Sequence, residues 1–496
     1  MKTTPILCAP CGQMQGIETN GISIYRNIPF ASAPRWQAPA AIEAWQGVRE
    51  CFEYGPAPIQ NAPDPYWAKR TGEPLEFPQS EECLNLNIWV GNSSTPKKAV
   101  LFWVYGGSYI LGYNYKKSYL PDKFVARHPE IIVVAPNYRV GVLGSLNLSC
   151  LTDSRDYAFS NNLALLDILC ALQWVQKNIA AFGGDPDRVT LYGHSAGSNA
   201  ISHLMAMPKA KGLFKRTICQ SSFMTDLGTV ALDTSEEIGR KFFELAQCTT
   251  LQQALSLPCE KILQVQKELF KYHYGGSHAS KMFSPVEDGL VVAKEPFSAF
   301  AKGECNSEQV MIGGSQGEYD QMMRPKTLEE NKEFVIERNA DKKLTAEKVE
   351  AFIALHPEMD AKEAVMSIHN ELGLSLGGEW IGRAICKKVP VYEYNFWLRE
   401  GEEHFRAAHG APSNYVFDTL PAPDAPAGLS VQMMDTWAAF IKTGDPNNAL
   451  IPAWPRYEPD GSVMVMDRQW QAVKGYWSKD FAFWRSSFAE SKYNIG

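Results

Sequence analysis

The sequence predicts an α/β protein built on an open, mostly parallel, doubly wound sheet. Continuous apolar runs, which are typical of strands buried on both faces of such a sheet, occur at 99–104 and 131–135, and a short apolar run lies at 189–192. Further candidates for buried strands are 217–220, 310–313 and 390–396. Between the second and third runs, 162–182 has apolar residues at helical spacing and stops before Gly183-Gly184-Asp185-Pro186. Strands that alternate with helices predict parallel pairing, with ligands bound at the carboxyl ends of the strands.

The remaining segments are predicted in chain order. Residues 16–45 alternate short apolar runs with Gly and Pro turns, which indicates small opening strands. Residues 52–83 are rich in proline and predict a long irregular loop. Residues 327–373 carry more charge, and Thr345 and Asp360 can each start an amphipathic helix. We expect one domain over 1–496 with a helical cap around 320–385, although a solvated surface insertion fits that segment equally well.

Composition limits the possible functions. The 48 basic and 55 acidic residues give a net charge of −7 without long blocks of one sign, so no nucleic-acid partner is expected. No apolar run approaches the length of a membrane span. Eleven scattered cysteines favour reduced thiols and a cytoplasmic protein, and the lone Cys8-x-x-Cys11 pair does not predict a metal site. We expect no cofactor, no metal, and a monomer or small homo-oligomer.

The strongest chemical signal is Gly193-His194-Ser195-Ala196-Gly197, a Gly-x-Ser-x-Gly motif that follows the apolar run at 189–192 and leads into helix-forming sequence. A strand, a sharp turn and a helix in this order hold a serine hydroxyl exposed in a strained turn. The unpaired N–H groups of the helix then favour negative charge on a nearby substrate oxygen. Because a five-residue match also arises by chance, the motif alone leaves a plain turn equally open.

A nucleophilic serine needs a histidine base and a carboxylate that orients it. The histidines considered are His278, His356, His369, His404 and His409. His409 is favoured because it lies in a turn of small residues after the run at 390–396, where an imidazole has room to point inward. Glu318 and Asp320 both follow the run at 310–313, and position alone favours Glu318 without excluding Asp320.

The oxyanion of an acyl-transfer reaction needs backbone donors. Gly106-Gly107-Ser108 directly follows the run at 99–104 and therefore belongs to the same edge of the sheet as Ser195. The N–H of Ala196 would complete the set. A plain Gly-Gly turn remains the alternative.

Taken together, these residues resemble the type-B carboxylesterases, the cholinesterase-like branch of the α/β-hydrolase fold. The matching motifs span nearly the whole chain: 28–31 (IPFA), 80–87 (SEECLNLN), 137–141 (NYRVG), 174–179 (WVQKNI), 182–186 (FGGDP), 283–289 (FSPVEDG) and 440–446 (FIKTGDP). The resemblance implies Ser195 as nucleophile, His409 as base and Glu318, rather than Asp320, as acid. It also implies oxyanion donors at Gly107, Ser108 and Ala196, and a supporting serine at Ser221.

Departures from the family pattern are informative. Relatives usually carry Glu where this chain has His194, which removes a negative charge beside the nucleophile and argues against choline esters. Pro58 stands where the partner of Cys83 is expected, and the tryptophan that binds choline is missing. Ser108 replaces a third glycine, and its Cβ is expected to disfavour esters of bulky tertiary alcohols.

The sequence therefore predicts a serine carboxylesterase that hydrolyses small to medium, uncharged esters through an acyl-serine intermediate. Two alternatives are a lipase for longer acyl chains and a non-catalytic, cholinesterase-like binding protein. Six residues that flank the motifs are expected to line the substrate pocket: Tyr105, Tyr109, His194, Phe223, Tyr319 and Met322.

Overall fold

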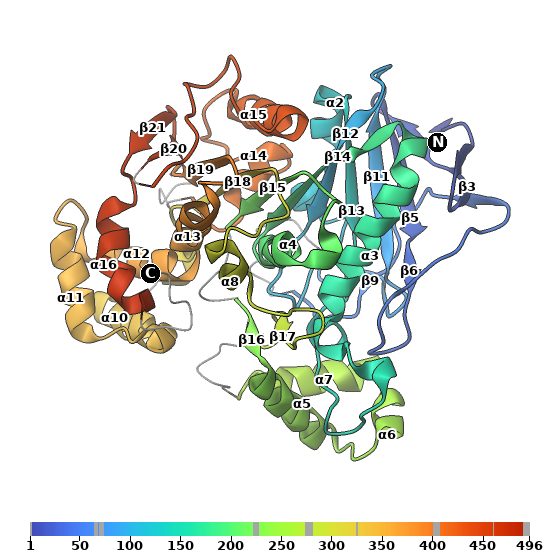
Figure 1. Cartoon of the computed structure of the whole chain (residues 1–496), viewed down its shortest axis with the longest axis horizontal. Coiled ribbons are helices and arrows are strands. Elements are labelled where there is room, and N and C mark those ends of the chain that lie inside the picture. The colour runs from blue at the N-terminus through green and yellow to red at the C-terminus, as the bar shows by residue number, and fades with distance from the viewer. Residues whose placement is uncertain are drawn as a thin grey trace.

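One large central sheet organises the computed structural model, which describes residues 2–63, 68, 74–221, 228–272, 281–323, 326–399, 407–459 and 461–489 (Figure 1). In spatial order its strands are β1 (Lys2–Thr3), β4 (Ile17–Thr19), β5 (Ile22–Pro29), β11 (Asn85–Gly91), β13 (Ile131–Pro136), β12 (Lys98–Val104), β14 (Gly184–His194), β15 (Arg216–Gln220), β18 (Gln309–Ser315), β19 (Val391–Phe396), β20 (Ser462–Met466) and β21 (Gln471–Lys474). From β13 to β20 all neighbours pair in parallel, whereas the strands at both edges pair antiparallel. The predicted open, mostly parallel sheet is thereby confirmed.

The central strands coincide with the apolar runs. Every residue of β12, β13 and β19 is buried, as expected for strands covered on both faces. The register places Val104 of β12 beside Gly193 of β14, and His194 beside Gln220 of β15. The carboxyl ends of neighbouring strands therefore meet at one edge of the sheet, where the predicted chemistry lies.

The crossover helix also forms as predicted. Helix α3 (Leu163–Asn178) continues as a 3₁₀ turn (Ile179–Phe182) and ends at Gly183, which adopts φ +83°. The helical run Arg155–Phe182 is long and apolar enough to cross a membrane, but 78% of its most apolar window is buried inside the protein. Helices α3 and α4 (Ala196–Ala206) both pack on β14. The run is therefore the core helix of this fold.

Residues 320–385 form a succession of helices: α9 (Asp320–Met323), α10 (Leu328–Arg338), α11 (Ala346–Leu355), α12 (Ala361–Asn370), a π-helix (Glu371–Ser375) and α13 (Leu376–Ile385). Thr345 and Asp360 cap α11 and α12, as predicted from the sequence. Thr327 caps a further helix, α10, through a reciprocal capping box with Glu330, which the sequence analysis did not identify. In Figure 1, α10, α11 and α12 lie together at the left, beside α16 (Ser478–Ala489).

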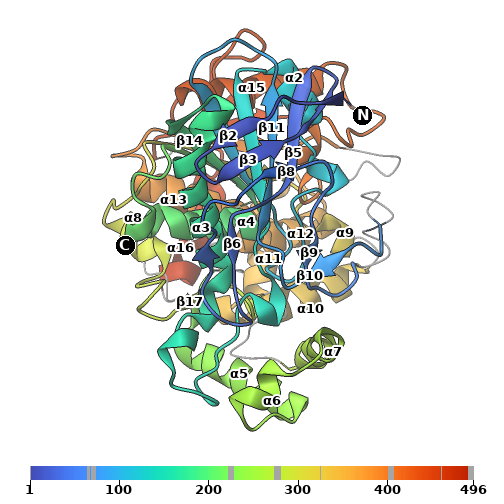
Figure 2. The same cartoon turned by 90° about the vertical axis from the view of Figure 1, so that its right-hand side faces the viewer.

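A second helical group was not predicted. Helices α5 (Leu232–Ala246), α6 (Leu251–Leu255) and α7 (Cys259–Leu269) project from the lower end of the molecule in both views (Figures 1 and 2). The group is anchored to the body by side-chain contacts. Gln266 of α7 accepts a hydrogen bond from the Val142 N–H, and Arg35 donates to the carbonyls of Leu255 and Leu257.

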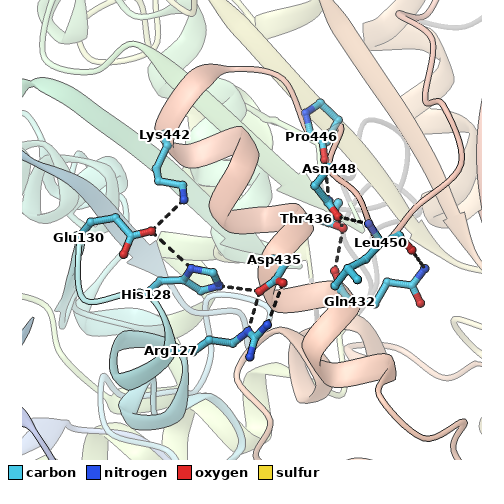
Figure 3. A network of polar contacts seen from close by, with 10 residues as sticks. All are labelled: Arg127, His128, Glu130, Gln432, Asp435, Thr436, Lys442, Pro446, Asn448 and Leu450. Atoms are coloured by element: carbon cyan, nitrogen blue, oxygen red, sulfur yellow. Dashed lines mark hydrogen bonds and ion pairs between the residues drawn. The ribbon is translucent and has the colours of Figure 1, made fainter.

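A polar network joins α2 (Asp122–Arg127) to α15 (Leu429–Thr443) at the surface (Figure 3). Arg127 binds Asp435 through two nitrogen atoms, at 2.6 and 2.8 Å, and His128 lies 3.0 Å from the same carboxylate. Glu130 bridges His128 and Lys442. Burial lowers the pKa of His128 despite these two carboxylates, so the network is held mainly by Arg127 and Lys442. It fixes α15 against the start of β13.

Two buried carboxyl groups lie where α13 crosses β19. Glu379 Oε1 is 2.5 Å from Arg383 Nε and accepts a hydrogen bond from the Tyr457 hydroxyl, whereas Glu393 accepts one from the Trp477 indole. Burial raises the pKa of Glu393 well above its ordinary value, and the neighbouring charge of Glu379 adds to the shift. Burial therefore favours the protonated form of Glu393.

The raised pKa of Glu393 makes the stability of the fold depend on pH. A Glu whose pKa is raised in the native state contributes stability below its unfolded pKa of about 4.5, and this contribution is lost as the pH rises toward the native pKa. We expect the free energy of unfolding of the wild type to fall relative to that of Glu393→Gln by up to ~1.4 kcal/mol per pH unit over that range. Urea unfolding of both proteins between pH 5 and 9 measures this difference, and parallel profiles would contradict the prediction.

Candidate active site

Ser195 occupies a strained turn between β14 and α4. Its backbone has φ +59° and ψ −127°, a region that residues with side chains rarely adopt. The turn is possible because α4 begins unusually close to β12. A Cβ on Gly197 would lie 2.1 Å from the Val104 carbonyl oxygen and 2.6 Å from that of Tyr105. The glycine after the serine is therefore required by the contact between helix and strand.

The segment after β12 runs beside Ser195. A Cβ on Gly106 would lie 2.6 Å from the Cβ of Ser195. Gly107 and Ser108 follow with φ +131° and +56°. Within the described part of the chain, the backbone N–H groups of Gly107 and Ser108 donate no hydrogen bond, and Ala196 is the first residue of α4, where an N–H has no partner in the helix. The three predicted donors are thus available next to Ser195 for an oxyanion.

Ser195, His409 and Glu318 form one chain of hydrogen bonds. The Ser195 hydroxyl lies 2.9 Å from His409 Nε2, and His409 Nδ1 lies 2.6 Å from Glu318 Oε2. Ser195 and Glu318 are buried, whereas the His409 side chain keeps 27% of its surface exposed. A serine, an imidazole and a carboxylate in this order can activate the hydroxyl as a nucleophile and stabilise the imidazolium that forms.

The other carboxylate oxygen of Glu318 accepts two hydrogen bonds that hold the side chain in place. Oε1 accepts hydrogen bonds from the Ser221 hydroxyl at 2.7 Å and from the Ser315 N–H at 2.8 Å. Asp320, the other carboxylate that follows β18, is fully buried but binds Asn370. The sequence analysis missed the Ser315 N–H, because a backbone donor three residues away leaves no side-chain signal.

Of the other histidine candidates, two lie away from Ser195 and two fall outside the described residues. His356 contacts Glu358 and Asp480 at the start of α16. His369 lies in α12, where its ring packs on Tyr319. His278 and His404 fall outside the described residues.

Among the predicted pocket residues, Tyr105 and Tyr109 are core side chains. The Tyr105 hydroxyl donates to the Tyr138 carbonyl, and the Tyr109 hydroxyl donates to Asn199 Oδ1 at 2.8 Å. Tyr319 is half-buried and parallel to the His409 ring, with centroids 6.5 Å apart. Phe223 lies outside the described residues, as does the side chain of Met322.

His194 lies directly against the catalytic candidates. Its ring centroid is 4.5 Å from that of His409, and its Nε2 is shielded from solvent without a hydrogen-bond partner among the described residues. Burial lowers the pKa of His194 well below its ordinary value, and the nearby His409 and Lys116 lower it further. His194 is therefore a neutral imidazole, in a place where additional positive charge is unfavourable.

Comparison with known proteins agrees with this geometry. The chain matches the Carboxylesterase family over residues 3–484 and belongs to it. It is 30% identical to the fumonisin B1 esterase of Sphingopyxis macrogoltabida, with 92% of this chain and 85% of that protein covered. It is 29% identical to the para-nitrobenzyl esterase of Bacillus subtilis, with 94% and 96% covered.

Solved structures support the same assignment. The carboxylesterase EST55 of Geobacillus stearothermophilus superposes with a TM-score of 0.84 at 28% identity, covering 97% of this chain and all of the other. A thermophilic pNB esterase superposes with a TM-score of 0.82 at 27% identity, covering 97% and 99%. The predicted α/β-hydrolase fold and family resemblance are confirmed. The protein is a carboxylic ester hydrolase.

The contact at Gly197 can be tested directly. A Cβ there would overlap two backbone carbonyl oxygens, which cannot rotate away, so we expect Gly197→Ala to destabilise the protein by about 1–3 kcal/mol and to lower ester hydrolysis. The matched control is Gly382→Ala in α13, where the nearest atom is 3.4 Å away and alanine favours the helix. Thermal unfolding and p-nitrophenyl acetate hydrolysis distinguish the two variants. Equal effects of both substitutions would refute the role of the close contact.

Proposed function

We propose that this carboxylesterase acts through an acyl-serine intermediate. Ser195 attacks the ester carbonyl while His409 takes the hydroxyl proton, and His409 then donates that proton to the departing alkoxide. In the second half, His409 deprotonates a water that attacks the acyl carbon, and His409 returns the proton to Ser195 Oγ as the bond to the acid breaks. Glu318 holds the imidazole in the required orientation. The observation that carries this proposal is the unbroken hydrogen-bond chain from Ser195 through His409 to Glu318.

The developing oxyanion is assigned to the N–H groups of Gly107, Ser108 and Ala196. This assignment is supported by the close approach of Gly106 to Ser195 and by the unused N–H groups that follow it. Removal of one such donor typically raises the barrier by about 2.7–4 kcal/mol.

The substrates that fit this site best are small to medium, uncharged esters. The support is electrostatic, because a neutral His194 packs against the base, and the nearby Lys116 adds positive charge, so neither residue offers a negative charge to a cationic leaving group. A cytoplasmic location is proposed with it, since all eleven cysteines are free thiols, as is usual in a reducing compartment.

Replacement of the nucleophile is the direct test. We expect Ser195→Ala to lower kcat for p-nitrophenyl acetate by at least ~10⁴-fold and to abolish labelling by a fluorophosphonate probe, because the substitution removes the hydroxyl that lies 2.9 Å from His409 Nε2. The matched control is Ser202→Ala, a buried serine of the same helix whose hydroxyl donates to the Ser198 carbonyl. Hydrolysis that survives Ser195→Ala would overturn the mechanism, and absence of labelling and turnover in the wild type would favour a binding protein.

The charge preference predicts a second outcome. We expect His194→Glu to raise the ratio of kcat/KM for acetylthiocholine over its uncharged analogue 3,3-dimethylbutyl thioacetate by about tenfold, or ~1.4 kcal/mol, because a carboxylate there attracts the cation. His194→Gln, which adds no charge, should leave the ratio unchanged. Steady-state kinetics with both thioesters measures the effect, and an equal ratio in all three proteins would exclude His194 as its source.

A further inference from the structure

The loop that carries Glu318 is fixed from the side of the sheet. The Gln316 N–H donates to the Phe396 carbonyl at the end of β19, and the Gly317 N–H donates to the Ala407 carbonyl, two residues before His409. These bonds tie the loop to the strand and to the histidine turn. They do not restrain its other side, where the chain turns from Glu318 into α9.

On the side of the Glu318 loop that faces away from the sheet, three hydrogen bonds are made by a single side chain of α12. Asn370, the last residue of α12, accepts a hydrogen bond from the Tyr319 N–H at 2.8 Å through Oδ1. Its Nδ2 donates to the Gln316 carbonyl at 3.1 Å and to Asp320 Oδ1 at 3.0 Å. A single buried amide therefore binds residues on both sides of Glu318.

The chemistry of these three contacts requires an amide. Two acceptors and one donor face the side chain, and only an amide offers both an NH₂ group and a carbonyl oxygen in so short a reach. Asp320 is fully buried, so its carboxylate needs the donor that Asn370 supplies. An aspartate in place of Asn370 would instead bring a second carboxylate against Asp320 and the Gln316 carbonyl.

The residues next to Asn370 pack on the same loop. The π-helix Glu371–Ser375 begins at the next residue, and such departures from α-helical geometry often occur at functional sites. His369 packs on the Tyr319 ring with centroids 4.3 Å apart, and Tyr319 in turn lies parallel to His409. The end of α12 thus packs on the residue that follows the proposed catalytic acid.

We propose that Asn370 is a positioning residue for the catalytic acid. It fixes the backbone on both sides of Glu318, so that the carboxylate reaches His409 Nδ1, and it thereby gives the helical segment 328–385 a part in catalysis without contact with the substrate. The inference deepens the proposed function and rests on the assignment of Glu318 as the acid.

The test compares two buried asparagines of the same helical segment. Asn370→Ala should lower kcat for p-nitrophenyl acetate about 10- to 100-fold with KM unchanged within about twofold, because a displaced acid misorients the base without altering the ester-binding surface. Asn339→Ala is the matched control. Asn339 is fully buried and donates to the Val335 carbonyl, and its Nδ2 also lies 3.4 Å from His369 Nδ1. Neither contact reaches residues 316–320, so its loss should lower the melting temperature but leave kcat near the wild-type value.

A second variant keeps the side-chain volume and decides the question if Asn370→Ala does not fold. Asn370→Asp should lose kcat at pH 8 and recover it relative to the wild type as the pH falls toward 6, because a protonated carboxyl restores a donor to the pair it forms with Asp320. Rates are normalised to folded protein by circular dichroism. A wild-type kcat at pH 8 in either folded Asn370 variant would overturn the positioning role.

The outcome separates this inference from the mechanism on which it rests. If Ser195→Ala abolishes turnover while the Asn370 variants keep the wild-type kcat, the acyl-serine mechanism stands and only the positioning role fails. If Ser195→Ala remains active, the mechanism itself is wrong. Equal losses of kcat in Asn370→Ala and Asn339→Ala would overturn the positioning role, because they would assign the effect to general destabilisation of the segment.

Discussion

The close approach of α4 to β12 at Gly197 is the constraint on which the candidate site depends. It brings the first turn of the helix against the Val104 and Tyr105 carbonyls, and the chain can join β14 to α4 only through the strained backbone at Ser195. The same approach places the N-terminal N–H groups of α4 beside the segment that follows β12. A single packing contact therefore accompanies the strained turn at Ser195 and brings the backbone N–H groups near it.

The parallel sheet supplies the rest of the site. Ser195, Glu318 and His409 each follow a central strand, and parallel pairing brings the carboxyl ends of β14, β18 and β19 to one edge. Ser195 and His409 meet at 2.9 Å although 214 positions separate them in the chain. The loops need to carry only one functional side chain each, because the sheet fixes their spacing.

Buried charge at this edge is balanced by dedicated donors. Glu318 is paired with His409, Ser221 and the Ser315 N–H, and Asp320 is paired with Asn370. At Glu393, further from the site, burial raises the pKa and so favours the protonated carboxyl. His194 follows the same rule as a neutral imidazole. The residue beside the proposed base therefore carries no negative charge, which is the basis of the charge preference proposed for the site.

The sequence by itself determined six central strands of the sheet, the motif at Ser195, and the family to which the protein belongs, because these depend on local periodicity and on spacing within short segments. Its residues alone left Glu318 and Asp320 open, and could not show that Tyr105 and Tyr109 are buried. In the tertiary structure Glu318 contacts His409 whereas Asp320 contacts Asn370 of α12, although both carboxylates follow the same strand. It also revealed Asn370, whose contacts lie about fifty residues away in the chain and leave no pattern in the sequence.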